Sequence, residues 1–371
     1  MKGDPFNGTF NGKRVLVLGH TGFKGSWLAV WLNKLGADVF GASVDIPTDP
    51  SHFVSANIDS LCRSWTLDIR NLNQLKNCFN EAQPEFVFHL AAQALVGRSY
   101  THPGDTFATK LMGTVNVMEC LKGMGHEVTA IMITSDKAYE NVERVQGYRE
   151  DDRLGGRDPY SASKGCADIA IRAYVESFFK EKNGGAQIAV GRAGNVIGGG
   201  DWSEGRLVPD VIRAWSSGEK LSIRSPKATR PWQHVLEPLS GYLHLAAKAG
   251  AGVIDQGEAF NFGPRSEDLA TVQDIAMSLR ESLGGLDIEI VKNTETSSFH
   301  EAGLLKLSCD KALHLLNWRP VMTIKETLDM TSDWYLSFRR EPESVLEMSN
   351  SQIERYCDLA FERKVSWANS D

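Results

Sequence analysis

The sequence predicts an α/β protein with a doubly wound parallel sheet and a smaller, mostly helical lobe in its C-terminal part. Two observations predict this fold class. Short apolar runs alternate with longer amphipathic segments through the first half of the chain, as the crossovers of a parallel sheet require. A glycine-rich turn, GHTGFKGS, also joins the first apolar run to the first amphipathic segment. Such a turn between a strand and a helix is typical of a Rossmann-type sheet.

Short apolar runs bounded by glycine, proline or polar residues are predicted to be the strands. A further strand is expected just before Asp68, in the stretch TLDIR. Helices are expected in the amphipathic segments between them, such as WLAVWLNKLG and GTVNVMECLKGMG. The predicted strands are residues 14–18, 38–43, 86–90, 129–134 and 187–192.

The alternation becomes irregular after residue 193. We therefore expect a dinucleotide-binding domain over residues 1–193 and a substrate-binding lobe over residues 194–371. The run EAFNFG predicts a strand near residues 258–263 that returns to the main sheet. Residues 344–364 are expected to form a last helix, and the final stretch WANSD is expected to be a frayed end.

Composition and charge exclude several classes of function. The net charge of −7, with no block of lysine or arginine, argues against a nucleic-acid partner. No apolar run approaches the roughly 18 residues of a membrane span, and the start MKGDPFNGTF lacks the apolar core of a signal peptide. A cytoplasmic protein is therefore expected. The six cysteines are scattered without metal-ligand spacing, so we predict packing residues and no metal site.

The turn after the first strand carries Gly19, Gly22 and Gly25. Glycines here permit a tight turn and a close approach to a pyrophosphate, while the following helix N-terminus supplies N–H groups. The turn therefore predicts a dinucleotide site. Ser43 ends the second strand, where an acid would select NAD over NADP, and Asp45 follows two residues later, so NAD is the expected cofactor.

Two short motifs carry candidate catalytic groups. YSASK places Tyr160 and Lys164 four residues apart, on one face of a helix that the Asp-Pro before it would start. The lysine is expected to lower the pKa of the phenol from about 10 toward neutrality, as a base for a hydroxyl proton requires. TSDKAY places Ser135, Asp136 and Lys137 at the end of an apolar strand.

The glycine turn, the HLAAQ run, the serine at a strand end and YxxxK together resemble the extended short-chain dehydrogenase/reductase superfamily. Within it, GHTGFKGSW, TSDKAY, DPYSASK, GNVIGGGDW and LNWRP most resemble the nucleotide-sugar 4,6-dehydratases of CDP-glucose. The resemblance implies bound NAD and a nucleotide-sugar substrate. It also implies a homodimer or higher homo-oligomer, formed through the GTVNVMECLKG helix and the helix from Tyr160 to about Lys182.

The reaction implied by this resemblance has three steps. Tyr160, helped by Ser135, takes the 4-hydroxyl proton while hydride leaves C4 for NAD. Lys137 or a neighbouring base removes the C5 proton, and Asp136 protonates the departing C6 hydroxyl. The hydride then returns to C6. Because an unperturbed lysine has a pKa near 10.4, Lys137 could instead stabilise the developing enolate by its charge.

The resemblance also assigns binding residues. Asp68 is expected near the adenine amino group, with a surface turn as the alternative. The cofactor contacts are Gly19, Gly22, Phe23, Lys24, Gly25, Ser43, Asp68, Ile69, Leu90, Ala91, Ala92, Tyr160 and Lys164. The substrate contacts are Asn195, Arg206, Leu207, Arg230 and His300. Trp202 or Trp232 would stack on the base or, alternatively, pack under a loop.

Two residues depart from the superfamily pattern. Lys110 stands where an asparagine that orders a water relay is usual, and Ser43 replaces the usual acid. Three alternatives remain open: a dehydratase for a UDP, dTDP or GDP sugar, a nucleotide-sugar 4-epimerase, and a dinucleotide-sensing regulatory protein. The pair Asp136–Lys137 argues against the epimerase, which would leave both groups idle, and the intact pair Tyr160–Lys164 argues against the regulatory protein.

Overall fold

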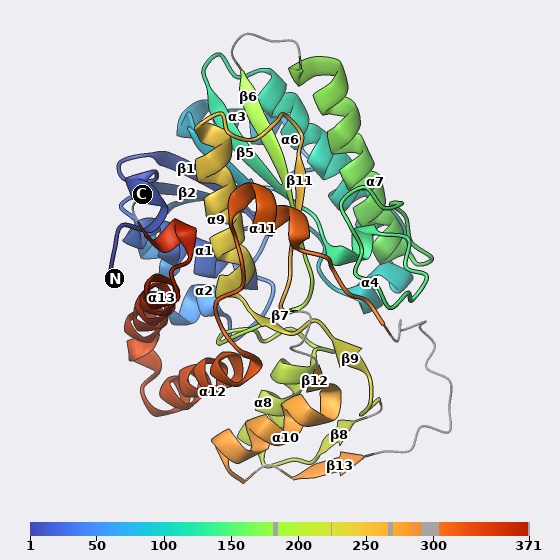
Figure 1. The fold of residues 1–371 in the computed structure, drawn as a ribbon, viewed down its shortest axis with the longest axis vertical. Coiled ribbons are helices and arrows are strands. Elements are labelled where there is room, and N and C mark those ends of the chain that lie inside the picture. Colours follow the sequence, from blue (N-terminus) through green and yellow to red (C-terminus); the bar gives the residue numbers. More distant parts are fainter. Residues whose placement is uncertain (181–184, 224, 266–269, 286, 291–303, 370–371) are drawn as a thin grey trace.

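The computed structural model describes residues 1–180, 185–223, 225–265, 270–285, 287–290 and 304–369. Its centre is a seven-stranded parallel sheet in the order β11-β6-β5-β4-β1-β2-β3, which confirms the predicted fold class (Figure 1). The switch in strand order lies between β1 and β4, where doubly wound sheets bind their ligands. The strands are β1 (Arg14–Leu18), β2 (Asp38–Ser43), β3 (Arg63–Thr66), β4 (Phe86–His89), β5 (Val128–Ile133), β6 (Ala186–Ala193) and β11 (Ala259–Phe262).

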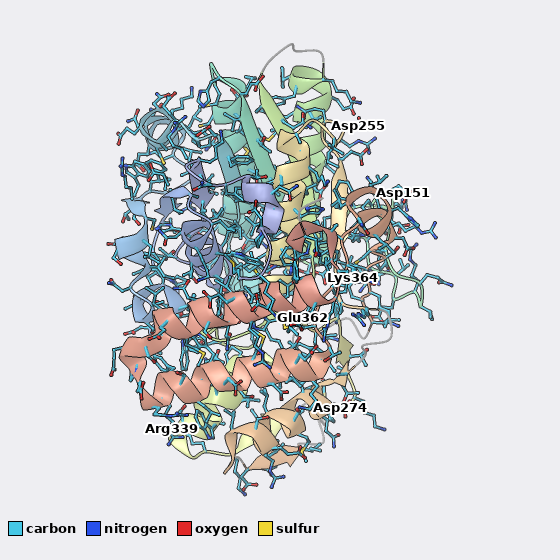
Figure 2. The ribbon with its side chains drawn as sticks, turned by 60° about the vertical axis from the view of Figure 1, so that its left-hand side comes forward. Asp151, Asp255, Asp274, Arg339, Glu362 and Lys364 are labelled. Carbon is cyan, nitrogen blue, oxygen red and sulfur yellow. The ribbon has the colours of Figure 1, made fainter. Side chains whose placement is uncertain are left out.

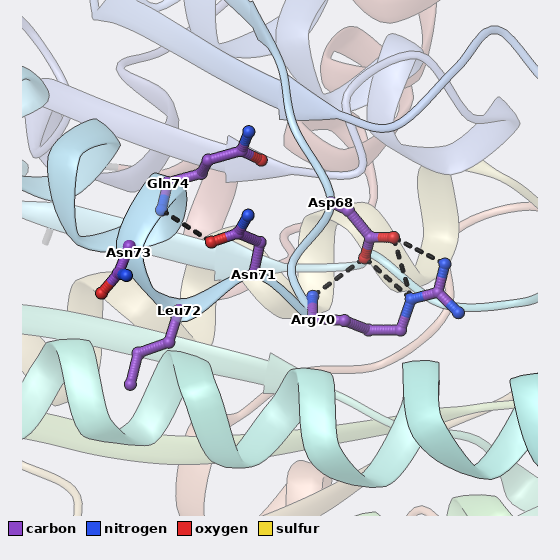
Figure 3. Close-up of a pocket in the computed structure, with 6 residues that line it drawn as sticks. All are labelled: Asp68, Arg70, Asn71, Leu72, Asn73 and Gln74. Atoms are coloured by element: carbon purple, nitrogen blue, oxygen red, sulfur yellow. Dashed lines mark hydrogen bonds and ion pairs between the residues drawn. The ribbon is translucent and has the colours of Figure 1, made fainter.

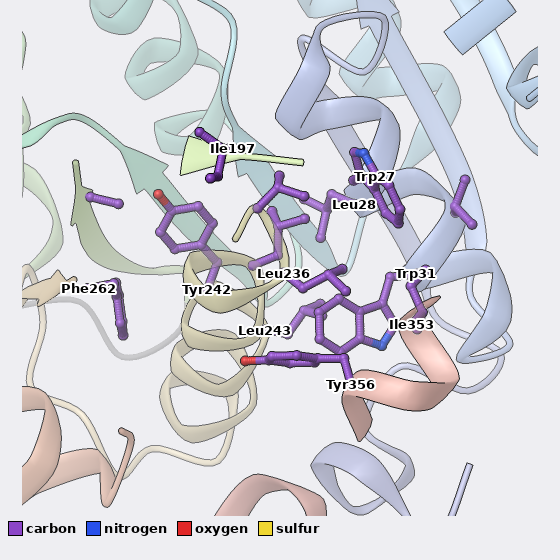
Figure 4. Packing of buried hydrophobic residues seen from close by; sticks show 14 of the residues in the cluster. Trp27, Leu28, Trp31, Ile197, Leu236, Tyr242, Leu243, Phe262, Ile353 and Tyr356 are labelled. Atoms are coloured by element: carbon purple, nitrogen blue, oxygen red, sulfur yellow. The ribbon is translucent and has the colours of Figure 1, made fainter. Parts of the chain in front are cut away.

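Helices cover both faces of this sheet, and the alternation of strand residues decides which side chain meets which layer. In β1, Leu16 and Leu18 face the layer of α3, α6 and α7, whereas Val15 and Val17 face the layer of α1, α9 and α13. Figure 4 shows the second layer, with Trp31 of α1 packed near Leu243 and Tyr356. These helices are α1 (Phe23–Lys34), α3 (Leu72–Ala82), α6 (Gly113–Lys122), α7 (Pro159–Tyr174), α9 (Leu236–Gly250) and α13 (Val345–Glu362).

Short helices and helical turns connect these elements in the first half of the chain. A π-helical turn, η3 (Ala108–Met112), leads directly into α6, and a second one, η5 (Val175–Phe179), follows α7. The 3-10 turn η4 (Asp136–Ala138) follows β5 and packs against α7. The others are η1 (Pro5–Gly8), α2 (His52–Ser55), η2 (Ile58–Leu61), α4 (Val96–Thr101) and α5 (Pro103–Phe107).

The C-terminal elements divide between the sheet and a separate lobe, which lies below the sheet in Figure 1. The lobe contains α8 (Leu207–Ser217), α10 (Val272–Leu283), α12 (Ile324–Arg340) and three two-stranded pairs. By contrast, α9 packs on β5 and β6, and β11 pairs with β6. The part of the chain after residue 193 therefore contributes both to the main sheet and to the lobe. The strand pairs are β7 (Val196–Ile197) with β10 (Gln233–His234), β8 (Leu221–Ile223) with β13 (Ile288–Ile290), and β9 (Thr229–Arg230) with β12 (Ala270–Thr271).

The end of the chain packs against the N-terminal segment. Figure 2 shows the two long helices side by side, α12 reaching Arg339 and α13 reaching Glu362. After α13, the turn η7 (Ser366–Ala368) buries Trp367, which stacks on Phe6 with ring centres 5.1 Å apart. The prediction of a frayed end was therefore wrong for Trp367 and Ala368. Burial of the indole stabilises this turn by more free energy than the ordering of its few residues costs. The remaining elements are α11 (Asp310–Leu316) and η6 (Pro342–Ser344).

Candidate active site

The glycine turn between β1 and α1 forms a cradle of backbone. Gly19 has φ +92°, and a Cβ there would lie 2.8 Å from the backbone nitrogen of Ala91. A Cβ on Gly25 would lie 2.0 Å from the carbonyl oxygen of Gly19, so neither position admits a side chain. Gly22 caps α1 without a side-chain hydrogen bond, which leaves the N–H groups of the first turn, from Phe23 onward, to meet a ligand. This geometry fits a pyrophosphate.

Ser43 at the end of β2 contacts the glycine turn. Its Oγ lies 3.0 Å from His20 Nδ1 and accepts a hydrogen bond of 3.3 Å from the N–H of Thr21. Burial lowers the pKa of His20 to about 4, so the ring is neutral at physiological pH. His20 was not predicted from the sequence, although Gly41 in the strand interior was a signal: a Cβ there would lie 2.2 Å from the His20 ring.

Asp68 follows β3 and is engaged by a neighbouring arginine. Its carboxylate accepts hydrogen bonds from Arg70 Nε, at 2.8 Å to Oδ2, and from Arg70 Nη2, at 2.6 Å, and this contact lowers the pKa of Asp68 (Figure 3). Arg70 also bonds Asp105, at 2.8 Å. The pocket in Figure 3 is lined by Asp68, Arg70 and the start of α3. A contact of Asp68 with adenine stays a prediction.

The other predicted cofactor residues lie around the same edge of the sheet. Leu90 donates its N–H to Leu18 at 2.8 Å, which places Leu90, Ala91 and Ala92 beside the end of β1. Ile69 is buried, and its side chain fills the space over Gly113 of α6. Carboxyl ends of adjacent parallel strands thus surround the cradle, where a dinucleotide would lie.

The five predicted catalytic residues come together at the ends of β5 and α7. Asp158 caps α7 by accepting the N–H of Ser161 at 3.0 Å, and the helix then presents Tyr160 and Lys164 on one face. Ser135 Oγ donates to Asp136 Oδ1 at 2.8 Å. Lys137 Nζ lies 5.3 Å from the centre of the Tyr160 ring, and the charge of Asp136 acts on both Tyr160 and Lys164.

Burial sets the proton affinities of these groups. The side chain of Asp136 is only 2% exposed, and burial raises its pKa even though Lys137, Ser135 and Lys24 oppose the shift. Burial lowers the pKa of Lys164 to about 8. Burial also raises the pKa of Tyr160 to about 12, the direction opposite to the one we predicted from its lysine neighbour. The phenolate loses more hydration than the nearby charges restore in this arrangement.

Two more lysines reach the same group. Burial and the charge of Lys164 lower the pKa of Lys24 to about 8, and the charge of Asp136 opposes this shift. Lys24, which was predicted to bind the cofactor, therefore also lies near the predicted acid Asp136. Lys110, in η3, lies with Nζ 3.0 Å from the centre of the Tyr160 ring. Among the described residues, no other lysine or arginine side chain lies so close to the Tyr160 ring.

A buried ion pair lies next to the predicted catalytic residues. Arg192 of β6 donates to Asp168 of α7 through Nε at 2.8 Å and Nη2 at 2.7 Å. Thr134, at the end of β5, donates its hydroxyl to the same carboxylate at 2.9 Å. Arg192 Nη1 also donates to the hydroxyl of Tyr139 at 2.8 Å. These contacts fix β5, β6 and α7 relative to one another, and sequence pattern alone did not reveal them.

Most of the predicted substrate residues border this group. Arg206 caps α8, forms an ion pair of 2.9 Å with Asp201, and places its charge near Tyr160. Leu207 begins α8. Asn195 follows Gly194, whose Cβ would lie 3.0 Å from Asp136 Oδ2.

Arg230 of β9 precedes Pro231, whose ring also borders Gly194, and donates to the carbonyl of Thr229 at 2.8 Å. His300 lies outside the described residues. Trp232 is 7% exposed and donates to the carbonyl of Ala270 at 3.1 Å, and Trp202 packs against Tyr335. Trp232 is thus buried and Trp202 is partly buried, and a stacking contact of either one with a base stays a prediction.

Cysteines, metal ligands and long apolar helices would indicate other kinds of site. All six cysteines are free thiols. Within residues 1–369, apart from the gaps given above, no group of three or more histidine, cysteine, aspartate or glutamate side chains could hold a metal ion. In that same part of the chain, no helix has both the length and the apolar character to span a bilayer.

Comparisons with known proteins agree with this geometry. Residues 15–263 match the model of the NAD dependent epimerase/dehydratase family. The chain is 45% identical to CDP-glucose 4,6-dehydratase of Salmonella typhimurium, over 94% of this chain and 97% of that protein. The crystal structure of the dTDP-glucose 4,6-dehydratase DesIV of Streptomyces venezuelae has a TM-score of 0.74 at 22% identity, covering 89% of this chain and 99% of that one. UDP-glucose 4-epimerase of Thermotoga maritima has a TM-score of 0.73 at 24% identity, covering 88% and 99%.

Proposed function

Because this chain belongs to the NAD dependent epimerase/dehydratase family, we propose that it is a nucleotide-sugar 4,6-dehydratase that converts CDP-glucose to CDP-4-keto-6-deoxyglucose and water. The observation that carries the proposal is the buried acid Asp136, held by Ser135 beside Tyr160 and Lys164. Oxidation or epimerisation at one carbon would not need this additional acid. The 45% identity to a CDP-glucose 4,6-dehydratase supports the same choice.

The cradle fits NAD as the resident cofactor. Gly19 and Gly25 leave backbone where side chains would block a pyrophosphate, and the first turn of α1 supplies N–H groups. Ser43, Ile69 and Leu90–Ala92 surround the adjoining strand ends. NAD held in this cradle would supply a hydride acceptor for C4 of the sugar and a hydride donor for C6. Oxidation of C4 to a ketone makes the C5 proton acidic.

The side chains of the chain then move the protons. Tyr160 Oη takes the proton of the 4-hydroxyl, helped by Ser135, which caps η4 after the end of β5. Burial raises the pKa of Asp136, which is the direction a general acid requires, and we assign to this carboxyl the proton that the C6 oxygen takes up as water leaves. Lys137 Nζ, close to the Tyr160 ring, is positioned to act at C5 as the base or as the charge that stabilises the enolate.

The diphosphate of the substrate requires cations at the mouth of the site. Arg206 lies at the N-terminus of α8, so its guanidinium and the helix N–H groups of the first turn favour the same anion. Arg230 lies on β9, directly before Pro231, whose ring borders Gly194. Asn195 directly follows Gly194, and Leu207 is the first residue of α8.

The proposal extends to a cytoplasmic homodimer or higher homo-oligomer formed through η3, α6 and α7. These segments, together with η5 after α7, pack against one another and leave large apolar side chains exposed: Met112 of η3 at 50%, Ile169 of α7 at 53% and Phe178 of η5 at 41%. Apolar side chains exposed to this degree on adjacent helices are typical of an interface core. Light scattering of the protein and of an Ile169→Asp variant tests this, because a dimer should become a monomer.

Incubation of the purified protein with CDP-glucose, and separately with UDP, dTDP and GDP sugars, tests the reaction. Mass spectrometry should find the loss of a water molecule from CDP-glucose and from none of the others. Loss of water from another sugar nucleotide would keep the mechanism and change the base that is recognised. An isomer of unchanged mass would mean an epimerase, and the role of Asp136 would then be wrong.

A further inference from the structure

The most unusual side chain in the active site is Lys110. Its relative exposure is 2%, and its Nζ lies 3.0 Å from the centre of the Tyr160 ring. The same Nζ donates a hydrogen bond of 3.3 Å to the backbone carbonyl of Tyr160. Lys110 occupies the π-helical turn η3, and single π-turns inside helices are frequent at functional sites. The turn directs this amine at one residue, the catalytic phenol.

Burial of this amine is costly, which makes its position informative. No carboxylate among the described residues forms an ion pair with Lys110. Asp158 is near, but its carboxylate is engaged by Ser161 in the cap of α7. A charged lysine without a paired acid loses several kcal/mol of hydration, so the group releases its proton instead. Burial and the charges of Lys164 and Lys137 accordingly lower the pKa of Lys110 to about 5.

The lysine and the phenol therefore hold complementary states. With Tyr160 protonated, Lys110 is a neutral amine next to the cationic Lys164. If the phenol loses its proton, a negative charge appears on the ring that Lys110 Nζ contacts. That charge favours protonation of the amine, because opposite charges within a few ångströms stabilise each other. Two groups coupled so closely titrate as a pair.

We propose that Lys110 is a positioning residue for the catalytic base, which gains a proton as Tyr160 loses one and so places a second ammonium beside the phenolate. The Oη–H bond of Tyr160 breaks, an Nζ–H bond forms on Lys110, and both protons exchange with solvent. No net charge is added to the buried site. The inference deepens the proposed function, on which it rests for the role of Tyr160 as base.

Other charged groups face the phenol and set the background against which Lys110 acts. Arg206, at the start of α8, favours the phenolate. Asp136 of η4 and Asp158 before α7 oppose it. Lys164, one turn along α7, and Lys137, with Nζ 5.3 Å from the ring centre, are further cations, and Lys24 of α1 lies near Lys164 and Asp136. Since Lys110 is nearer to the ring than Lys137, its removal should have the larger effect.

The test is a titration of Tyr160 in the purified protein, before any substrate is added. Tyrosinate absorbance is recorded against pH as the difference between the protein and its Tyr160→Phe variant. The same difference is then measured with Lys110→Met in both proteins. Without Lys110, the fraction of Tyr160 present as tyrosinate at a fixed pH up to about 11 should fall at least about tenfold, as expected for removal of an adjacent opposite charge. The rate of the first hydride transfer at neutral pH should fall at least about tenfold and recover as the pH rises.

Lys122→Met is the matched control. Lys122 Nζ lies 4.7 Å from the ring centre of Phe178, so its removal also deletes a contact between a lysine and an aromatic ring, but outside the site. It should leave the Tyr160 titration unchanged. An unchanged titration in Lys110→Met would overturn the proposal and make Lys110 a packing residue, and if that variant fails to fold, Lys110→Asn decides in the same way. Because this titration needs no turnover, its result is independent of whether CDP-glucose is the substrate.

Discussion

Removing the charge of Asp168 should destabilise the protein strongly, although Asp168 itself is not expected to touch substrate. The carboxylate accepts hydrogen bonds from Arg192 Nε and Nη2 and from Thr134 Oγ1, at 2.7–2.9 Å, and both side chains of the ion pair are 4% exposed. Asp168→Asn keeps the shape but leaves the guanidinium buried without its counter-charge. Loss of one partner of such a pair typically costs about 3–5 kcal/mol. A pair of unit charges about 4 Å apart, at an effective dielectric constant near 20, gives a similar figure of about 4 kcal/mol.

Urea unfolding followed by tryptophan fluorescence measures this cost. Asp329→Asn is the matched control, because Asp329 pairs with Lys325 at 2.7 Å on the surface and should contribute less than about 1 kcal/mol. Replacing the pair together, with Asp168→Leu and Arg192→Met, should restore most of the lost stability, since no uncompensated charge remains. The reasoning is refuted if Asp168→Asn costs no more than Asp329→Asn, or if the double replacement is the least stable of all.

Three further predictions concern single residues. Burial lowers the pKa of His52 to about 3, so its neutral ring contributes stability above pH about 6.5 that is lost as the pH falls, at about 1.4 kcal/mol per pH unit; urea unfolding at pH 7 and pH 5 should show a flatter dependence in His52→Asn. Gly25→Ala should abolish measurable NAD binding in calorimetry, because its Cβ would meet the Gly19 carbonyl, whereas Gly104→Ala, with open space around it, should bind normally. Asp136→Asn should slow water loss at least about a hundredfold while NAD binding is retained.

The sequence was sufficient for the sheet because strand residues alternate locally between two apolar layers. The pattern RVLVL divides its valines and leucines between the two helical layers, as β1 does in the structure. The error at Trp367 arises because its partners are not local in this sense. The indole stacks on Phe6, near the start of the chain, and on Tyr356, in the preceding helix α13. A short final stretch carries no pattern that reports such partners.

The candidate site was predictable where one motif carries several of its groups. TSDKAY and YSASK placed Asp136 and Tyr160 together, because a strand end and the following helix meet at the same edge of a parallel sheet. The electrostatics were not predictable in the same way. The pKa of Tyr160 depends on how completely its surroundings exclude water and on charges such as Arg206, which comes from the other lobe. Such contacts between distant segments leave no local pattern.

The most direct test of the central claim uses CDP-glucose labelled with deuterium at C4. We expect the deuterium at C6 of the 4-keto-6-deoxy product, because the hydride that leaves C4 returns to C6 after Asp136 has helped to expel water. The C5 position should gain a proton from the solvent. Deuterium retained at C4 of an isomer of unchanged mass would instead indicate an epimerase and contradict the account.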